Sequence, residues 1–167
     1  MPEVVSNTSP LQYLHQLGLL DLLPTLYGSV FVPNAVVMEV EAGRFLGVPL
    51  PVLDHLPWIR VQEVASAALL PLVPDLGAGE REVLALALER SDPLVILDDS
   101  FARRFARSLG LSLTGTLGLL LKGKEIGRID RVGPFVDRLE ALNFRLDQRT
   151  RRDVLALAGE TSRSTEG

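Results

Sequence analysis

The sequence contains no cysteine, only two histidines, and few aromatic side chains, which make up 5% of its residues. The absence of cysteine excludes disulfides, thiolate catalysis and cysteine-based zinc sites. The histidines, His15 and His55, have no partner at a spacing typical of metal ligands, so we expect core or surface roles for both. A P-loop is excluded because the G-x-x-x-x-G-K-[ST] pattern is missing. Ser9 and Ser100 lack suitable His–Asp partners for a nucleophilic triad.

The chain also lacks an uninterrupted apolar run of about 18 residues, and no basic leader precedes an apolar segment. We therefore expect no membrane span and a cytoplasmic location. A length of 167 residues fits one domain with one sizeable core. We expect residues 1–158 to form that domain and the polar residues 159–167 to form a disordered tail.

The hydrophobic fraction is 47%, which is typical of a parallel sheet with helices on both faces. Short β-branched or apolar runs alternate with helical patterns. We predict strands at residues 3–6, 30–32, 58–61, 94–97 and 111–113. We predict helices after Ser9 (as N-cap) up to Gly18, at residues 19–23 before Pro24, and from Pro33 through Val40. Further helices are predicted at residues 80–89, 101–109 and 116–126, and a last helix or pair of helices over residues 131–158. Residues 43–57 are expected to be irregular with a short helix, and residues 66–76 a short helix or loop.

Charge is unevenly distributed along the chain, whose net charge is −4. Residues 1–100 carry 4 Lys/Arg against 13 Asp/Glu, a net of −9, whereas residues 101–131 carry 7 against 2, a net of +5. An acidic part followed by a basic part fits metal ligands beside a phosphate-binding rim. Ordinary solvated helix faces would give the same distribution.

In parallel α/β sheets, ligands bind outside the carboxyl ends of the strands. That rule selects Asn7, which follows the first predicted strand, and the pair Asp98 and Asp99, which follows the apolar run Leu94–Leu97. Glu39 and Glu80 lie on helices that could bring them to the same crevice. Clustered carboxylates repel one another, so such a cluster favours a bound cation. Oxygen ligands without cysteine or clustered histidine select Mg²⁺ or Mn²⁺, which can activate water for phosphodiester hydrolysis.

Each of these acidic residues also has a purely structural interpretation. Glu80 in the first turn of a helix is favoured by the helix dipole. Either Asp98 or Asp99 would suit the N-cap of the following helix, although only one of them is needed there. Glu39 on a helix is most often simply exposed.

Several segments together resemble the PIN domain family, in particular its VapC-like toxin group and a poorly characterised prokaryotic subgroup. They are Val5–Leu11, the Val32-Pro33 helix with Glu39, Gly77–Ala87, Leu97–Arg103 and Thr114–Gly118, in the order seen in that family. The resemblance covers about residues 3–145. It implies a PIN-like three-layer α/β/α domain with a parallel four- to five-stranded sheet. It further implies an endoribonuclease that holds one or two Mg²⁺ or Mn²⁺ ions with acidic residues.

Carried over by position, the resemblance implies a catalytic set of Asn7, Glu39, Glu80, Asp98 and Asp99. Of these, Asn7, Glu80, Asp98 and Asp99 are the expected metal ligands, with the register inside the aspartate pair left open. Asn7 departs from the family, because it replaces the first aspartate and brings no negative charge. Residues expected to contact RNA are Thr8, Ser9, Arg103, Arg104, Arg107 and Lys122.

Two functions from different classes follow. The first is a metal-dependent ribonuclease that acts as the toxin of a toxin–antitoxin pair, with RNA, a small antitoxin and a second copy of the chain as partners. The second is a PIN-fold module with a weakened metal site that binds RNA or a partner protein. A third alternative is a small-phosphoester hydrolase.

Overall fold

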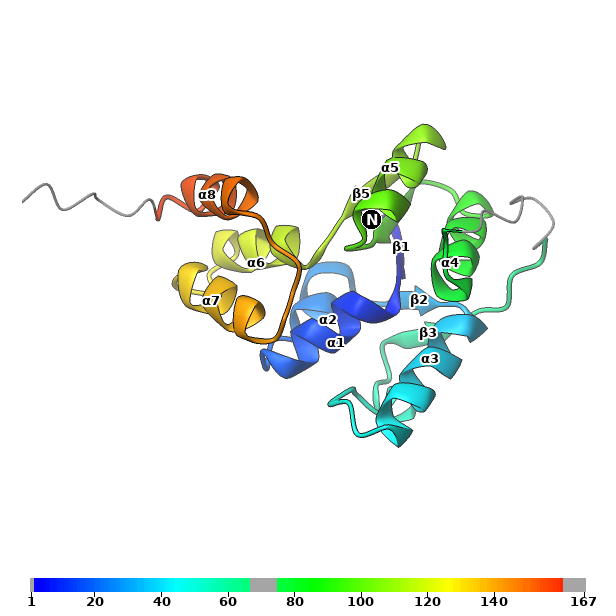
Figure 1. Ribbon diagram of the computed structural model, residues 1–167. Coiled ribbons are helices and arrows are strands. Elements are labelled where there is room, and N and C mark those ends of the chain that lie inside the picture. Colours follow the sequence, from blue (N-terminus) through cyan, green and yellow to red (C-terminus); the bar gives the residue numbers. More distant parts are fainter. Residues whose placement is uncertain (1, 67–74, 161–167) are drawn as a thin grey trace, which may run out of the picture. The chain divides into compact units, whose positions relative to one another are not determined.

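The structure is a computed structural model that describes residues 2–66 and 75–160. Its strands form one five-stranded, fully parallel sheet in the order β3-β2-β1-β4-β5. The strands are β1 (Glu3–Ser6), β2 (Val30–Val32), β3 (Ile59–Val61), β4 (Pro93–Ile96) and β5 (Ser112–Thr114). The predicted three-layer α/β/α fold with a parallel sheet is confirmed. Figure 1 shows the strands and the helices that alternate with them.

Helices connect the strands, as right-handed crossovers between parallel strands require. They are α1 (Thr8–Gln16), α2 (Leu22–Tyr27), α3 (Asn34–Phe45), α4 (Ala78–Leu88), α5 (Ser100–Ser108), α6 (Thr116–Glu125), α7 (Gly133–Ala141) and α8 (Gln148–Leu157), with a short 3-10 helix at Leu53–His55. None of the helices within residues 2–66 and 75–160 combines the length and apolar composition needed to cross a bilayer.

The core of the sheet forms where apolar strands meet apolar helix faces. The central strand β1 and its neighbour β4 bury Val4, Val5, Val95 and Ile96 almost completely. Helix α4 packs on both of these strands and also lies along α3 (Figure 1). Its repeat of apolar side chains, including Leu84, faces this core, as a spacing of three to four residues predicts.

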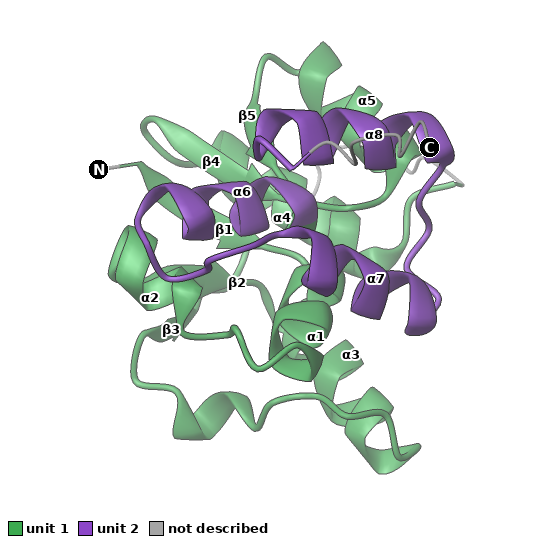
Figure 2. Ribbon diagram, turned by 90° about the vertical axis from the view of Figure 1, so that its left-hand side faces the viewer, with its two compact units in different colours: residues 1–116 green, residues 117–167 purple. Residues whose placement is uncertain are grey.

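Two compact units make up the chain, residues 1–116 and residues 117–167, coloured separately in Figure 2. The first unit contains the whole sheet with α1 to α5, and the second contains most of α6 together with α7 and α8. The expectation that residues 1–158 form one domain stays a prediction. The expected disordered tail needs a correction at its start, because Gly159 and Glu160 are structured and Glu160 makes several contacts within the second unit. Residues 161–167 lie outside the described residues.

The predicted ends of three helices differ from the structure, and one of these helices, α3, continues to Phe45 in the segment that was expected to be irregular. Helix α1 begins at Thr8 with Asn7 at the N-cap position, so Ser9 is not the N-cap; its hydroxyl instead bonds Asp98. Helix α2 runs through Pro24 to Tyr27, because Pro24 occupies the first turn, where a missing N–H costs nothing. Of the segment predicted at 66–76, residues 67–74 lie outside the described residues.

The strand order places a topological switch point at β1. The chain adds β2 and β3 on one side of β1, and then returns to add β4 and β5 on the other side. Ser6 of β1 pairs with Ile96 of β4, so both strands end at the same level. Sheets of this kind bind ligands beyond the carboxyl ends of their strands at such a point.

Candidate metal centre

Three adjacent strands bring polar side chains to this carboxyl edge. Asn7 follows β1, and its N–H donates to the Ile96 carbonyl on β4 at 3.1 Å. Asp98 and Asp99 follow β4, and Thr116 follows β5. Asn7 and the aspartate pair therefore reach the same edge, as predicted, because β1 and β4 are parallel neighbours that end at the same level.

Asn7 carries a buried acceptor that has no partner. The residue is 7% exposed, and its side-chain oxygen Oδ1 makes no hydrogen bond to any described residue. Asn7 occupies the N-cap position of α1, yet its side chain makes no capping hydrogen bond. A buried polar atom without a partner costs about 1–3 kcal/mol, so its presence at the sheet edge points to a ligand that satisfies it.

Glu39 reaches the same edge from α3 and is held by two donors. Thr8 Oγ1 donates to Glu39 Oε2 at 2.6 Å, and the Gly79 N–H donates to Glu39 Oε1 at 3.1 Å. Gly79 allows this approach because a Cβ there would lie 2.7 Å from both carboxylate oxygens. Glu39 is therefore fixed between the starts of α1 and α4.

Glu80 caps the start of α4 and also has a shifted pKa. Its Oε2 accepts a hydrogen bond of 2.6 Å from the Gly77 N–H at the start of α4, so the structural interpretation of this residue is correct. The pKa of Glu80 is nevertheless raised, mainly by burial and then by repulsion from Asp99 and Glu39. Only carboxylates close to one another raise a pKa in this way, so Glu39, Glu80 and Asp99 belong to one neighbourhood.

The two adjacent aspartates have different surroundings. Asp99 is exposed and caps α5 through one oxygen, Oδ1, which accepts from the Ala102 N–H at 2.9 Å. Asp98 is only partly exposed, and both of its oxygens are engaged by three donors. Ser9 Oγ and Thr116 Oγ1 donate to Oδ2 at 2.9 and 2.7 Å, and the Thr116 N–H donates to Oδ1 at 2.7 Å.

A close backbone approach at Gly115 makes the Asp98 contacts possible. A Cβ at Gly115 would lie 2.8 Å from Asp98 Oδ1, 2.9 Å from Arg103 Nη1 and 3.1 Å from the Leu97 carbonyl. Arg103 Nη1 donates to that carbonyl at 2.8 Å. Burial and the neighbouring Arg107 lower the pKa of Arg103, while Asp98 opposes the shift. Arg103 therefore belongs to the edge of the site rather than to the open surface.

The residues expected to contact RNA are distributed more widely. The hydroxyls of Thr8 and Ser9 are already donated to Glu39 and Asp98. Arg104 and Arg107 are exposed on α5, the helix that begins at the site. Lys122 is exposed on α6 in the second unit.

A complete cage of acidic ligands is not formed. Within residues 2–66 and 75–160, no three His, Asp or Glu side chains are grouped so that they could hold a metal ion. Two features nevertheless fit a hard cation: the unpartnered Asn7 Oδ1, and the repulsion of Glu80 by Asp99 and Glu39, which a cation would relieve. All four side chains supply oxygen ligands.

Sequence reasoning gave no role to Gly115, Thr116 or Gly79, although two of the quoted motifs contain them. A glycine–threonine pair between a strand and a helix is a weak signal for a turn that contacts a carboxylate. Tyr13 was also missed; its pKa is raised mainly by burial and then by the negative charge of Asp98. No local pattern marks these neighbours, since Asp98 and Ser9 are 89 positions apart.

Comparison with known proteins gives one result for the chain. The comparisons with curated proteins and with solved structures gave no significant match. A family model for the PIN domain matches residues 3–160, almost the whole chain. PIN domains have a nuclease fold and generally use divalent metals. By this match, and in agreement with its parallel sheet and acidic edge, the chain belongs to the PIN domain family.

Proposed function

We propose that this PIN domain is a divalent-metal-dependent endoribonuclease that hydrolyses phosphodiester bonds in RNA. One observation carries the proposal: the buried Asn7 Oδ1 lacks a partner among the described residues, at the edge where Asp98 and Asp99 follow β4 and where Gly79, next to Glu80, binds Glu39. Perturbed carboxylates in a crevice are typical of functional sites.

The proposed ligands are Asn7, Glu80 and Asp99, with Glu39 at the same edge. When bound, Mg²⁺ or Mn²⁺ supplies Lewis acidity, an activated water and stabilisation of the leaving alkoxide. Glu39 would hold the attacking water through one of its two carboxylate oxygens, of which Oε2 now accepts from Thr8 and Oε1 from Gly79. Asn7 contributes an oxygen without charge, so we expect weaker metal binding than at a site with an aspartate there.

We assign different roles to the two aspartates, where the sequence had suggested both as ligands. Asp99 keeps its second oxygen, Oδ2, available, because only Oδ1 is used to cap α5. Asp98 directs both oxygens to Ser9 and Thr116, so it is a positioning residue that fixes the ends of β4 and β5 around the site. Its effect on catalysis would act through that geometry.

The basic side of α5 supports RNA as the substrate. Arg104 and Arg107 are exposed on a helix whose first turn carries Asp99, and Arg103 lies beside Asp98. Arginines can hold phosphates that flank the cleaved bond, which positions RNA without reading its sequence. Thr8, Ser9 and Lys122 stay predicted RNA contacts.

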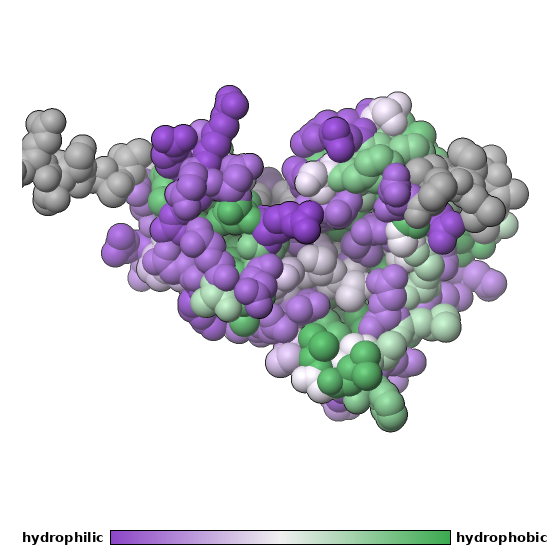
Figure 3. Space-filling view, viewed as in Figure 1, coloured by the Kyte–Doolittle hydropathy of each residue, from purple (hydrophilic) through white to green (hydrophobic). Residues whose placement is uncertain are grey.

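The toxin role, the small antitoxin and the homodimer are further parts of the proposal that rest on the VapC-like resemblance. The end of α3 offers a surface that a protein partner could cover. Met38 is 69% exposed, and Phe45 and Leu46 are 92% and 79% exposed. Figure 3 shows hydrophobic atoms over this lower end of the first unit. Induced expression that arrests growth, with relief by Asp99→Asn, would test the toxin role.

Cleavage of an RNA panel by the purified chain tests the enzymatic proposal. We expect cleavage with Mg²⁺ or Mn²⁺ that EDTA abolishes and that Asp99→Asn and the double variant Asp98→Asn/Asp99→Asn lack. The matched control is Asp153→Asn, an exposed aspartate of α8, which should cleave normally. Cleavage that persists in EDTA or in Asp99→Asn would contradict the proposal.

A second candidate is a PIN-fold module that binds RNA or a protein without cleaving. The neutral Asn7 and the lack of a preformed group of three acidic ligands among the described residues favour it. In the same experiment this candidate predicts metal-independent RNA binding and no cleavage at any Mn²⁺ concentration. Activity on a generic phosphodiester but not on RNA would instead indicate a small-phosphoester hydrolase.

A further inference from the structure

The second unit contains a groove that the proposed active site does not use. It encloses about 780 Å³ and is formed by the start of α7 and one face of α8 with the turn that follows. Its charged and polar lining consists of Arg131, Asp137, Gln148, Arg151, Arg152 and Glu160. All of its lining residues belong to the second unit.

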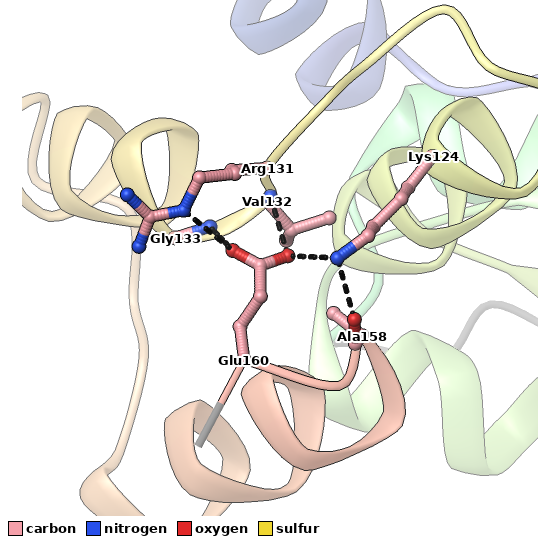
Figure 4. Close-up of polar contacts among 6 residues, drawn as sticks. All are labelled: Lys124, Arg131, Val132, Gly133, Ala158 and Glu160. Atoms are coloured by element: carbon pink, nitrogen blue, oxygen red, sulfur yellow. Dashed lines mark hydrogen bonds and ion pairs between the residues drawn. The ribbon is translucent and has the colours of Figure 1, made fainter. Parts of the chain in front are cut away.

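Neighbouring donors compensate the negative charge of the Glu160 carboxylate. Its side chain is 7% exposed and accepts from Lys124 Nζ at 2.8 Å, from the Val132 N–H at 2.8 Å and from the Gly133 N–H at 3.0 Å (Figure 4). Burial alone would raise its pKa, but Lys124 and the two amides lower the pKa to about 2. Glu160 therefore stays ionised and paired, and it adds little net negative charge to the groove.

The second acidic residue of the groove is also paired. Asp137 Oδ1 accepts from Arg151 Nη2 at 2.7 Å, while Arg151 Nη1 bonds Glu140 at 2.9 Å. These hydrogen bonds to two carboxylates raise the pKa of Arg151, with the bond to Asp137 contributing most. Arg151 of α8 therefore bonds two carboxylates of α7 and holds the two helices together.

Two arginines keep their charge available to a ligand. The Arg131 side chain is 71% exposed and forms one long ion pair, of 3.8 Å between its Nε and Glu160 Oε1, which is too far for a hydrogen bond (Figure 4). Arg152 is exposed and has no ion pair within the described part of the chain. With both acidic residues compensated, these side chains give the groove a net positive character.

We propose that this groove binds the phosphodiester backbone of single-stranded RNA, with Arg131 and Arg152 contacting phosphates. The proposal rests on RNA being the substrate of the proposed nuclease, and it adds a second RNA-binding site to the active site. Two separated guanidinium groups suit a chain of repeated phosphates better than one small anion. Gln148 can accept from and donate to ribose hydroxyls.

The test measures binding of a labelled single-stranded oligoribonucleotide by fluorescence anisotropy, in EDTA so that no cleavage occurs. We expect Arg131→Gln/Arg152→Gln to weaken binding about tenfold and to reduce the salt slope by about 1.4, since each phosphate contact contributes about 0.7. The matched control is Arg128→Gln/Arg145→Gln, which removes the same charge from exposed positions of the same unit outside the groove. The control should bind with nearly unchanged affinity.

Equal losses in both double variants would overturn the proposal, because net charge alone would then explain the binding. A polyglutamate peptide that binds as tightly as RNA and depends on the same two arginines would also overturn it, in favour of an acidic protein partner. The nuclease proposal fails separately: a chain that never cleaves RNA but needs Arg131 and Arg152 to bind it would leave the groove assignment intact. If the chain cleaves RNA but the groove variant binds RNA as tightly as the wild type, the groove assignment fails and the nuclease proposal stands.

Discussion

The Asp98 carboxylate binds Thr116 twice, through the Thr116 N–H and its hydroxyl, each at 2.7 Å. Because Thr116 is the first residue of α6, this pairing attaches the end of β4 to the start of that helix. Ser9 adds a third donor from α1. A single carboxylate thus connects three segments at the carboxyl edge of the sheet, directly beside the proposed metal ligand Asp99.

Replacing the two aspartates in turn should separate stability from catalysis. Asp98→Asn leaves one acceptor oxygen for three donors, so we expect a loss of about 1–3 kcal/mol in the free energy of unfolding. Asp99→Asn should cost little stability, since asparagine is an equally good N-cap, while it abolishes metal-dependent cleavage. Urea unfolding and RNA cleavage of both variants check this. Equal stability of Asp98→Asn and the wild type would contradict the positioning role.

Gly115→Ala should destabilise the protein although its backbone conformation is open to other residues. The new Cβ would lie within 3.1 Å of Asp98, Arg103 and the Leu97 carbonyl, and the carbonyl belongs to rigid backbone. We expect a cost of about 1–3 kcal/mol from this overpacking. Gly133→Ala is the control, because its Cβ would make ordinary contacts at 3.4 and 3.6 Å. Thermal unfolding should distinguish the two variants, and similar melting temperatures would show that the edge is not tightly packed.

Asn7→Asp should restore the charge that the family places at this position. Without metal the new carboxylate is buried beside other acids, so we expect lower stability than in the wild type. With Mn²⁺ we expect about tenfold tighter metal binding, because the ligand gains a full negative charge. Calorimetric titration with Mn²⁺ measures this, with the exposed Asn143→Asp as control. Unchanged Mn²⁺ affinity would place Asn7 outside the metal site.

Glu160→Gln should destabilise the second unit in a pH-dependent way. The folded pKa of about 2 lies below the ordinary value of 4.5, so ionised Glu160 contributes stability above pH 4.5 that is lost as pH falls toward 2. Urea unfolding should therefore show a large difference between variant and wild type at neutral pH and a much smaller one in acid. The control Glu125→Gln, at an exposed position, should show neither; a difference for Glu160→Gln that does not change with pH would exclude ionisation as its cause.

The fold could be predicted largely from local patterns. The apolar run ending at Leu97 becomes the buried strand β4, because only a strand covered on both faces tolerates continuous apolar side chains. The predicted strands overlap all five observed ones within one residue at each end. Helix starts were less certain. The cap of α1 lies at Asn7 rather than Ser9, because the Ser9 hydroxyl has a partner that no local pattern reveals.

By itself, the sequence determined that polar side chains would follow β1 and β4 and that parallel strands would align them at one edge. The distinct roles of Asp98 and Asp99 were decided only by tertiary structure, because neighbouring residues leave a strand in different directions and meet different partners. Asp98 meets Ser9 and Thr116, whereas Asp99 couples to Glu80. Glu160 is another such case: its polar context suggested a disordered tail, yet Lys124, 36 positions away, holds it in place. Contacts between distant segments depend on how helices and strands pack, and no periodicity in the chain encodes that packing.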